Sequence, residues 1–581
     1  MYLRSTQRRR KDGLAVRYVQ LAHNRRVEGV TRAEVLLNLG REDQLDVEGL
    51  RRLARSITRF TDPGAEEPAA GAEAAEGLEV SDSRPLGGAW LLDALWRRLG
   101  VAGALASALG QRRFATDVER VLFALVANRA LAPASKLAAS EWASCDVAIP
   151  GFEAMDEDQA YRAMDVLVEA DAEGKVQEAV FFACADLLNL EVDLLFFDTT
   201  STYFEIEGAD PDPLGEAGVG SGSVAPESPS TRGRGGPFRA HGHSKDHRPD
   251  LPQVVIGLAV TREGIPVRVW VWPGNTNDHS VIAQVKDDLR GWRLGRCVWV
   301  VDRGFSSEEN LRCLTKGGGH WIAGERMRDA HPDHEAALAR QGRYRTVRDN
   351  LRVKEVRVGE PDAAKRFVVC HNPYEAERDR SQRAETVGRL EAELDRLEAQ
   401  RKRAQGPKAT EAHLRGECAL RDHPSLGRYL RQLRSGRLRI DRARIRSEQR
   451  LDGKFLLSTS DPDLSAEDIA LGYKNLLEAE RSFRDLKGTL ELRPVFHRLE
   501  RRIRAHILIC WLALLMIRVA ERASGHSWRT IARELQRLHL VTLQSAAGQV
   551  RQTTPLSAEQ REILAALDID PPPRITALDP T

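Results

Sequence analysis

Two aspartates lie where an ionised side chain is costly. Asp198 follows the apolar run LLFF and Asp302 follows the apolar run VWVV, both in segments with the composition of buried strands. A carboxylate directly after four apolar strand residues is unfavourable unless it faces a cation or a water-filled cleft. Each aspartate alone could instead cap a turn, which fits Asp302 before Arg303 and Gly304. Two such placements in one sheet favour carboxylates that converge on Mg²⁺, which prefers oxygen ligands and acts in pairs on phosphodiesters.

Glu480 is the third candidate acid. It falls in a helical pattern that we expect to run from Ser465 to Lys487. One face of this helix could present Glu480 to a metal ion, and Arg484 and Lys487 to phosphate. The alternative is an i,i+4 ion pair between Glu480 and Arg484 on a solvated helix. The residues that share the face of Glu480, at relative positions −7, +3, +4 and +7, are Tyr473, Phe483, Arg484 and Lys487.

These three regions together resemble a known family. DTTS at Asp198, DRGFSSEEN at Asp302 and the segment from Tyr473 through ERSFRDLK to Lys487 resemble the motif regions of DDE transposases from bacterial insertion sequences, in the group with a Tyr-Arg-Glu-Lys signature. The intervals of 104 and 178 residues between the three acids support the resemblance, which covers roughly residues 190 to 520.

One position departs from the signature. The residue three positions after Tyr473 is Leu476, where the signature has arginine. The role of that arginine in holding the DNA end is therefore open, or is shared by Lys474 and Arg481.

The resemblance implies a fold and a reaction. The fold is α/β and multidomain, with an RNase H-like mixed sheet flanked by helices, interrupted by an insertion domain and preceded by a mainly helical DNA-binding region. Asp198, Asp302 and Glu480 would be the catalytic, metal-binding acids. They would hold two Mg²⁺ ions, for which Mn²⁺ could substitute. The reaction would be hydrolysis of a strand at the element's end, followed by attack of the freed 3′-hydroxyl on target DNA.

The resemblance also implies partners. These are the transposon ends, the target DNA and, on DNA, a second copy of the chain. The residues expected to contact DNA are Tyr473, Arg484, Lys487, Lys245, Arg248 and Arg303.

The segment HGHSKDHRPDLPQV offers a competing metal site. His241, His243 and His247 with Asp246 could suggest zinc, but their spacing fits neither a helical histidine pair nor a zinc finger. A basic loop with Lys245 and Arg248 on phosphate is favoured. In the segment PGNTNDHS a turn and helix cap are expected, and Asn275 and Asp278 have no role that we can derive.

The elements that must position these residues follow from periodicity. Strand patterns begin at Leu194, Val254, Val267, Cys297 and His320, with helices expected at residues 279–292 and 307–316. The tryptophans Trp270, Trp272, Trp299 and Trp511 are expected in the core. We expect an α+β unit at 1–61, a linker at 62–87, a helical DNA-binding region at 88–190, the catalytic domain at 191–326 and 451–545, an insertion domain at 327–450 and a C-terminal tail at 546–581, loosely held beyond Gln552.

The N-terminal third is predicted in more detail. Strands are expected at residues 14–22 and 35–39, and a helix at 46–60. A capping-box pattern of Thr116 with Glu119 starts a helix that Pro133 stops, and Asp156 could cap another. A helical bundle carrying cations suits DNA binding, although a plain helical scaffold is the alternative. These cations are Arg120, Arg129, Lys136 and Arg162.

Charge is balanced overall and segregated locally. The chain of 581 residues has a net charge of +2 and is 42% hydrophobic and 30% charged, as in folded soluble proteins. Residues 428–450 carry nine arginines against Asp441 and Glu448, a local net charge of +7, which favours phosphate contact over a solvated helix face. Just before it, Val387, Leu390, Leu394 and Leu397 repeat as in a short coiled-coil hairpin.

A membrane protein, a secreted disulfide scaffold and a zinc-ribbon protein are disfavoured. The longest apolar run, Ile507 to Ile517, has 11 residues, and the seven cysteines contain no C-x-x-C pair. A cytoplasmic, nucleoid-associated protein is expected. Two alternatives to a transposase remain open: a structure-selective nuclease with the same fold, and a DNA-binding protein that has lost catalysis.

Overall fold

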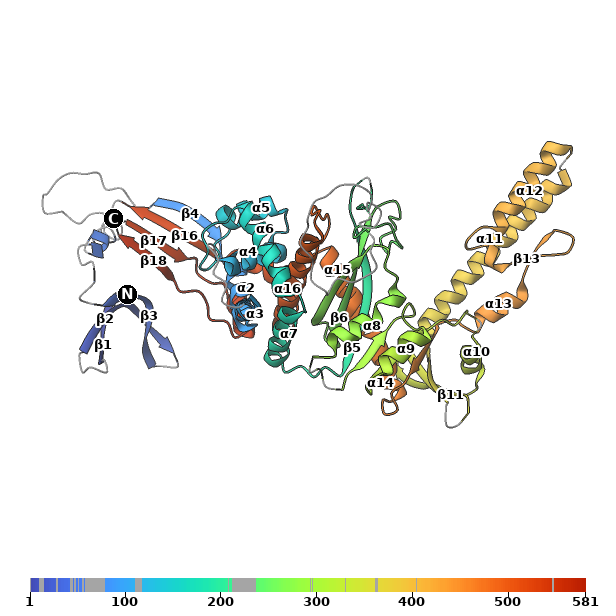
Figure 1. Cartoon of the computed structure of the whole chain (residues 1–581), viewed down its shortest axis with the longest axis horizontal. Coiled ribbons are helices and arrows are strands. Elements are labelled where there is room, and N and C mark those ends of the chain that lie inside the picture. Colours follow the sequence, from blue (N-terminus) through green and yellow to red (C-terminus); the bar gives the residue numbers. More distant parts are fainter. Residues whose placement is uncertain are drawn as a thin grey trace, which may run out of the picture.

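A computed structural model of the chain has an elongated shape (Figure 1). The two termini lie at one end, beside small sheets, and a helical arm projects from the other end. The structure describes residues 2–9, 15–27, 30–41, 45, 49–50, 52–54, 57, 79–109, 117–206, 208–211, 237–292, 294, 296–329, 331–360, 364–403, 405–545 and 548–580.

A nine-stranded mixed sheet forms the centre of the molecule, in the order β10-β11-β12-β15-β9-β8-β5-β6-β7. The strands β5 to β7 are antiparallel, whereas β8 runs parallel to β5 and β9 runs parallel to β8. Helices α8 (Ile282–Leu289) and α9 (Glu308–Thr315) separate the last three strands in sequence, as predicted. The first five strands are β5 (Leu194–Tyr203), β6 (Gln253–Thr261), β7 (Pro266–Pro273), β8 (Val298–Val301) and β9 (His320–Glu325).

The composition of these strands explains their position. β6 is buried along its whole length, and β5 and β7 nearly so, as expected when both faces of a sheet are covered. Trp270, Trp272 and Trp299 are 5–7% exposed, and Trp511 is fully buried, which confirms their expected core positions. The predicted fold class, a mixed α/β sheet flanked by helices, is confirmed.

The same sheet continues past residue 327, where the sequence suggested that an insertion begins. Antiparallel pairing joins β12 to β15 and β15 to β9, so these strands extend the catalytic sheet. The segment that leaves the sheet is shorter, residues 373–450, and is called the arm below. The extending elements are α10 (Pro332–Ala339), β10 (Arg345–Arg348), β11 (Leu351–Val358), β12 (Lys365–His371) and β15 (Lys454–Thr459).

The arm is a helical hairpin with a small ribbon at its side. Helices α11 (Pro373–Arg403) and α12 (Pro407–Arg421) are followed by the strand pair β13 (Leu430–Gln432) and β14 (Leu438–Ile440) and by α13 (Arg442–Gln449). The predicted coiled-coil hairpin is confirmed, because its leucines share one core. The buried members of that core are Leu390, Leu397, Leu420, Leu426, Tyr429 and Leu430.

A bundle of helices lies between the central sheet and the small sheets at the termini, with the apolar helix α16 (Glu500–Ser524) in it (Figure 1). α16 is long and apolar enough to span a membrane, but 94% of its most apolar window is buried inside the protein, as in a core helix. The surrounding helices are α2 (Gly87–Arg98), α3 (Val101–Leu109), α4 (Val118–Leu131), α5 (Lys136–Glu141), the π-helix Trp142–Asp146, α6 (Glu157–Ala170), α7 (Lys175–Leu187) and α17 (Trp528–Leu535).

Two helix starts were predicted in this region. Asp156 caps α6 in a complete capping box with Gln159, as expected. α4 begins at Asp117, whose carboxylate accepts a hydrogen bond from the Arg120 amide. The predicted cap Thr116 lies outside the described residues.

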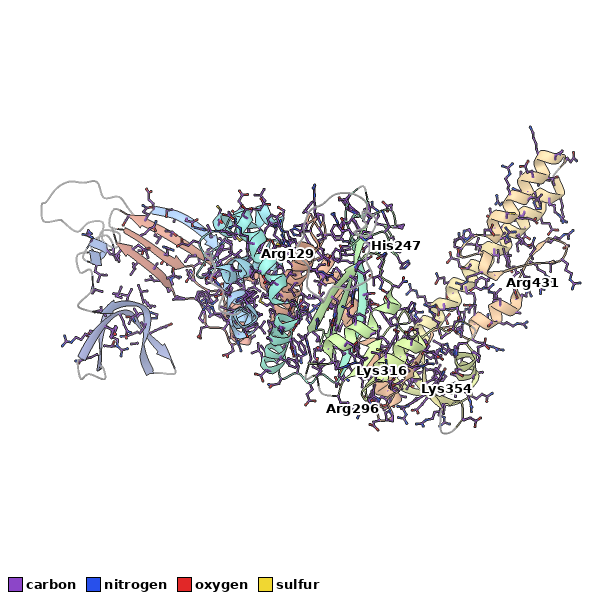
Figure 2. All side chains as sticks on the ribbon, viewed as in Figure 1. Arg129, His247, Arg296, Lys316, Lys354 and Arg431 are labelled. Carbon is purple, nitrogen blue, oxygen red and sulfur yellow. The ribbon has the colours of Figure 1, made fainter. Side chains whose placement is uncertain are left out.

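Most of the cations expected to bind DNA in this bundle are buried or ion-paired within the protein. Arg129 and Lys136 are 6% and 4% exposed, and Arg120 is paired with Asp93 at 2.6 Å. Figure 2 places Arg129 among the helices next to the sheet. Of the four cations, Arg162 alone is well exposed, with a side chain 76% exposed. The scaffold alternative therefore fits this bundle better than a row of phosphate contacts.

The ends of the chain differ from expectation. A four-stranded sheet has the order β18-β17-β16-β4, so the predicted loose tail is wrong: β18 (Ile575–Pro580) pairs with β17 (Gly548–Thr553). β4 (Glu79–Pro85) pairs with β16 (His539–Ser545), so the predicted linker ends before residue 79. Helix α18 (Ala558–Ala566) lies between β17 and β18 in sequence.

The N-terminal unit has three strands instead of two. β1 (Tyr2–Arg9) pairs with β2 (Ala15–Val27), which pairs with β3 (Val30–Arg41). β1 was missed because YLRSTQRR is mostly polar and lacks an apolar strand pattern. Most of the predicted helix at 46–60 and residues 62–78 of the predicted linker lie outside the described residues.

Candidate active site

Asp198 and Asp302 are brought together by the parallel pairing of β5 and β8. In that register Phe197 lies opposite Val301, so the next residues, Asp198 within β5 and Asp302 just after β8, lie side by side. Neighbouring strands lie about 4.8 Å apart. The sheet therefore places Asp302, which follows the carboxyl end of β8, beside Asp198 in the middle of the adjacent parallel strand β5.

The electrostatics of Asp198 agree with this proximity. Burial is the main reason that the pKa of Asp198 rises to about 6, and the charges of Asp302 and Asp278 raise it further. The Lys245 ammonium and a hydrogen bond from the Thr199 amide, at 2.7 Å, act in the opposite direction. A cation next to Asp198 therefore stabilises its ionised carboxylate.

Lys245 supplies a cation at this place. Its Nζ lies 3.1 Å from Asp278 Oδ2 and 3.9 Å from Asp198 Oδ1, and it donates to the carbonyl oxygen of Thr199 at 2.8 Å. The Thr199 hydroxyl donates to Asp278 Oδ1 at 2.7 Å. The ammonium therefore bridges the first predicted acid and an acid to which the sequence assigned no role.

Asp278 is the functional residue that sequence reasoning missed. It lies at the start of a 3-10 turn (Asp278–Ser280) after β7, and its Oδ2 is close to Gly304, in the loop that carries Asp302. The signal available in the sequence was the acid in PGNTNDHS at a strand end. Nothing in the spacing showed that this turn folds over Thr199, 79 residues earlier.

Tyr473 contacts the second acid. Its hydroxyl donates to Asp302 Oδ1 at 2.8 Å, and burial together with the charge of Asp302 raises the pKa of Tyr473. A Cβ on Gly324 would lie 2.2 Å from this hydroxyl, so glycine is needed for the tyrosine to reach the acid. In this conformation Tyr473 orients Asp302.

The helix predicted from Ser465 to Lys487 is two helices. α14 (Ala466–Lys474) ends at Asn475, and α15 (Leu477–Lys487) begins after a turn. Tyr473 and Glu480 consequently belong to different helices, and helical spacing no longer places them on one face. Asparagine has a low helix propensity and favours helix ends, which is consistent with the break.

Glu480 lies in the first turn of α15. It is exposed, and within the described part of the chain it forms no ion pair with Arg484, which removes the solvated-pair alternative. Lys487, two turns later on the same flank, pairs with Asp246 at 2.8 Å. Asp246 directly follows Lys245, so this flank of α15 is turned toward the acids.

Asp246 holds the loop that carries Lys245. Its carboxylate also pairs with Arg493 at 3.0 Å, and its side chain is only 11% exposed. The Lys245 amide donates to the Ser201 hydroxyl at 2.9 Å, which fixes the loop on the end of β5. The predicted basic loop is thus a structured element docked on the site, and Asp246 is an ion-pair partner there.

The other predicted DNA contacts surround the acids. Arg303 is 64% exposed and lies 3.9 Å from Asp302, whereas Arg248 pairs with Asp250 at 2.8 Å. At the position of the signature arginine, Leu476 is 8% exposed and packs in the core. Arg481, one of the two residues suggested to take the role of the signature arginine, pairs with Glu521 at 3.3 Å.

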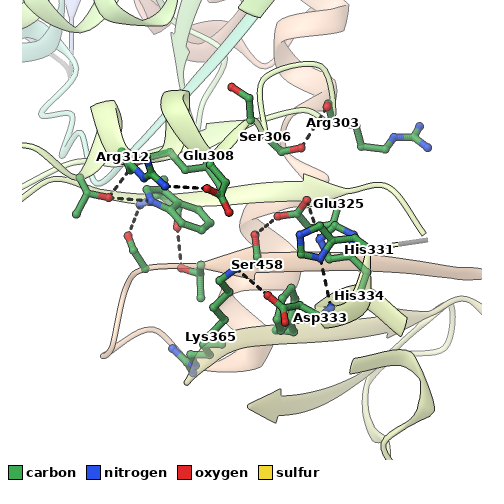
Figure 3. Close-up of a pocket in the computed structure, with 18 of the residues that line it drawn as sticks. Arg303, Ser306, Glu308, Arg312, Glu325, His331, Asp333, His334, Lys365 and Ser458 are labelled. Carbon is green, nitrogen blue, oxygen red and sulfur yellow. Dashed lines mark hydrogen bonds and ion pairs between the residues drawn. The ribbon is translucent and has the colours of Figure 1, made fainter. Parts of the chain in front are cut away.

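A cavity of about 1070 Å³ adjoins Arg303 (Figure 3). On its floor Glu325 accepts a hydrogen bond from Ser458 and lies 3.4 Å from His334, and burial raises the pKa of Glu325. Many of its other charges neutralise one another, as between Arg312 and Glu308 at 2.8 Å. The cavity is therefore a recess next to Arg303 in which many of the charges are already paired.

The donor set at the site suits a hard divalent cation in part. Asp198, Asp278 and Asp302 offer carboxylate oxygens, the ligands that Mg²⁺ prefers, and Lys245 already stands between two of them. Among the described residues, no three histidine, cysteine, aspartate or glutamate side chains are close enough together to hold a metal ion. The same result gives no support to zinc at His241, His243 and His247.

Comparison with protein families identifies the class. Residues 228–516 match the model of the transposase DDE domain, a range that contains Asp302 and Glu480 and begins after Asp198. The chain is a DDE transposase, an enzyme that cleaves DNA and transfers strands, and enzymes of this class use divalent metal ions.

A match in the N-terminal part of the chain points to one family within this class of transposases. Residues 3–69 match the model of the IS1634 family transposase N-terminal domain. The chain is thus similar in its N-terminal part to IS1634 family transposases, and the two matches together support a DDE transposase that binds DNA and catalyses transposition of an IS1634-family element.

Other comparisons add little. No curated protein matches the chain. Among solved structures, a piggyBac transposase synaptic complex with hairpin DNA matches with a TM-score of 0.33 and 11% identity over 77% of this chain and 78% of that chain. A match at this level supports no conclusion about this chain.

Proposed function

We propose that Asp198, Asp302 and Glu480 are the catalytic acids of this transposase and the ligands of its metal ions. The observation that carries the proposal is the β5–β8 register, which leaves Asp198 beside Asp302. The raised pKa of Asp198 supports it, because burial and the neighbouring acids destabilise the carboxylate and a bound cation would stabilise it.

Two Mg²⁺ ions, or Mn²⁺ in their place, would activate the attacking water or 3′-hydroxyl and stabilise the leaving oxygen. The protein's own residues prepare the site. Tyr473 orients Asp302, Thr199 orients Asp278, and Lys245 neutralises the acids. Glu480 joins the aspartates when α15 shifts toward them on the DNA-bound complex.

The DNA end would be held by cations around the acids. Arg303 and Arg484 have no strong partner among the described residues, and Lys487 would exchange Asp246 for a phosphate, with Lys245 and Arg248 on the same loop. Tyr473 would complete the Tyr-Arg-Glu-Lys arrangement, with Leu476 as its departure. The enzyme would act on DNA in the cytoplasm, as a homodimer that joins two ends.

Single replacement of each acid tests the assignment. Asp198→Ala, Asp302→Ala and Glu480→Ala should each abolish strand cleavage while binding to the element's end stays measurable. Glu478→Ala is the matched control, since Glu478 lies on α15 two residues from Glu480 and 3.8 Å from Arg481. Cleavage retained by any of the three acid variants would contradict the role of that acid.

A further inference from the structure

The arm carries two kinds of charged surface. On α11 and α12, exposed arginines alternate with glutamates and pair with them: Arg380 with Glu377 at 2.7 Å and Arg396 with Glu393 at 2.7 Å. Arg415 pairs likewise with Glu411 at 3.4 Å on α12. These two helices have the balanced surface of an ordinary solvated hairpin.

The ribbon and the short helix beside them are different. Here exposed arginines have no ion-pair partner within the described part of the chain, and we call them the arginine face. Its members are Arg431, Arg434, Arg437, Arg439, Arg442, Arg444, Arg446 and Arg450.

The two acids of this segment are occupied elsewhere. Asp441 caps α13, where its carboxylate accepts hydrogen bonds from the amides of Ala443 and Arg444 at 3.0 Å each. Glu448 pairs with Arg328 at 2.9 Å and with Arg428 at 3.8 Å. The positive charge of the arginine face is therefore not cancelled within the arm.

The fold also sets like charges against each other. Arg431 lies directly opposite Arg439 in the β13–β14 pair, an arrangement that destabilises a strand pair. Arg442 and Arg446 are one helical turn apart on α13, where like charges repel as well. An arrangement that costs stability in the free protein is relieved when a polyanion binds.

The ribbon is oriented to present these charges. Leu438 and Ile440 of β14 pack against the arm core, together with Leu430 of β13. Since side chains alternate along a strand, Arg431 and Arg439 lie on the opposite, outward side. Figure 2 shows Arg431 on the projecting arm, far from the sheet at the termini.

We propose that the arginine face binds the phosphate backbone of duplex DNA, at a place separate from the metal site. Guanidinium groups match phosphate oxygens and remain charged at any physiological pH. The segment 430–450 has no aromatic residue, and single strands are usually held by bases stacked on aromatic rings. The lack of aromatic stacking favours duplex DNA, and phosphate contacts carry no sequence information, so we expect binding to duplexes of any sequence.

Full-length protein with four arginines neutralised tests the proposal. The variant Arg431→Gln/Arg439→Gln/Arg442→Gln/Arg446→Gln is compared with the wild type for binding of a random-sequence duplex, in EDTA, across a salt series. Each phosphate contact adds about 0.9 to the salt slope, so four lost contacts should reduce the slope by about 3 to 4. Affinity at low salt should fall at least tenfold.

The matched control neutralises four exposed, ion-paired arginines of the same arm. Arg378→Gln/Arg380→Gln/Arg396→Gln/Arg415→Gln should leave the slope close to that of the wild type. An unchanged slope in the first variant, or an equal reduction in the control, would overturn the proposal.

Two further outcomes are decisive. A loss for a single strand as large as that for the duplex would overturn the assignment to duplex DNA. Loss of binding to polyglutamate with duplex binding intact would assign the face to an acidic protein instead. Because EDTA removes metal ions, none of these results depends on whether Asp198, Asp302 and Glu480 are correctly assigned.

Discussion

Asp302 shows how one side chain can be set by its neighbours. It leaves β8 beside Asp198 and accepts a hydrogen bond from Tyr473, whose approach requires Gly324. The motif resemblance suggested a phosphate contact for Tyr473. The geometry instead gives it the role of orienting an acid, and the two roles have different consequences.

Replacement of Tyr473 by phenylalanine separates them. Tyr473→Phe removes a hydrogen bond to a charged group, which is worth about 1.5–3 kcal/mol. We expect cleavage by the saturated protein–DNA complex to slow by about tenfold or more, with the Kd for the element's end unchanged. A weakened Kd with normal cleavage of the saturated complex would support the phosphate contact.

At the same scale, the sequence revealed the two aspartates and left Asp278 without a role. Asp198 and Asp302 could be found because each directly follows an apolar run of strand residues, a local pattern with a physical cost. Asp278 belongs to the site only because its turn folds over Thr199, a contact that depends on the tertiary structure. Lys245 was found, but its proximity to two acids was not.

Among the elements, the arm depends on a buried ion pair at its base. Arg383 of α11 is bidentate to Asp452, just before β15, with one of the two bonds at 2.6 Å. The two side chains are 7% and 13% exposed. Nearby, the Gly453 amide donates to Asp379 of α11 at 2.9 Å. These contacts fix the direction in which the arm leaves the sheet.

Breaking this pair should loosen the arm. Arg383→Met leaves Asp452 buried without its partner, and we expect a loss of about 3–5 kcal/mol of stability. Arg380→Met, in an exposed pair, should cost less than about 1 kcal/mol. Urea unfolding gives both values, and faster hydrogen exchange in the first turns of α11 should accompany the first. Equal effects of the two changes would argue against the anchor.

Element boundaries were predictable where the pattern was strong. The strands β5 to β9 and the apolar helix α16 follow from continuous apolar runs. The break between α14 and α15 was missed because one asparagine does little to interrupt a helical period. β18 was missed because its pairing with β17 lies in tertiary structure, whereas its sequence, ITALDP, reads as a tail.

At the scale of the whole molecule, the helical bundle and the catalytic sheet share one core. Arg129 of α4 donates to the carbonyl oxygens of Leu490 and Glu491, a few residues after the end of α15. His497 and His506 are buried at the same junction, 8% and 2% exposed. The bundle thus supports the segment that leads out of the Glu480 helix.

This junction should make stability depend on pH. Burial, together with the nearby charges of Lys136 and Arg129, lowers the pKa of His497 to about 3. The unfolded chain therefore binds more protons than the folded chain between about pH 3 and 6.5. Stability is fully present above about pH 6.5 and falls with acid, by about 1.4 kcal/mol per pH unit for each such histidine.

Urea unfolding of His497→Gln at several pH values measures this contribution. The variant should show a shallower loss of stability between pH 6.5 and 4.5 than the wild type. His526→Gln, at an exposed position, is the control and should keep the wild-type slope. Identical slopes for all three proteins would show that His497 does not link the junction to pH.

The central claim is that three separated acids hold metal ions together on the DNA-bound enzyme, and cysteine replacement with metal rescue tests it most directly. Mg²⁺ strongly prefers oxygen ligands, whereas Mn²⁺ accepts a thiolate more readily. Asp198→Cys, Asp302→Cys and Glu480→Cys should each lose DNA cleavage in Mg²⁺ and regain part of it in Mn²⁺, while Glu478→Cys cleaves in both. Normal cleavage in Mg²⁺ by the Glu480→Cys variant would contradict the account.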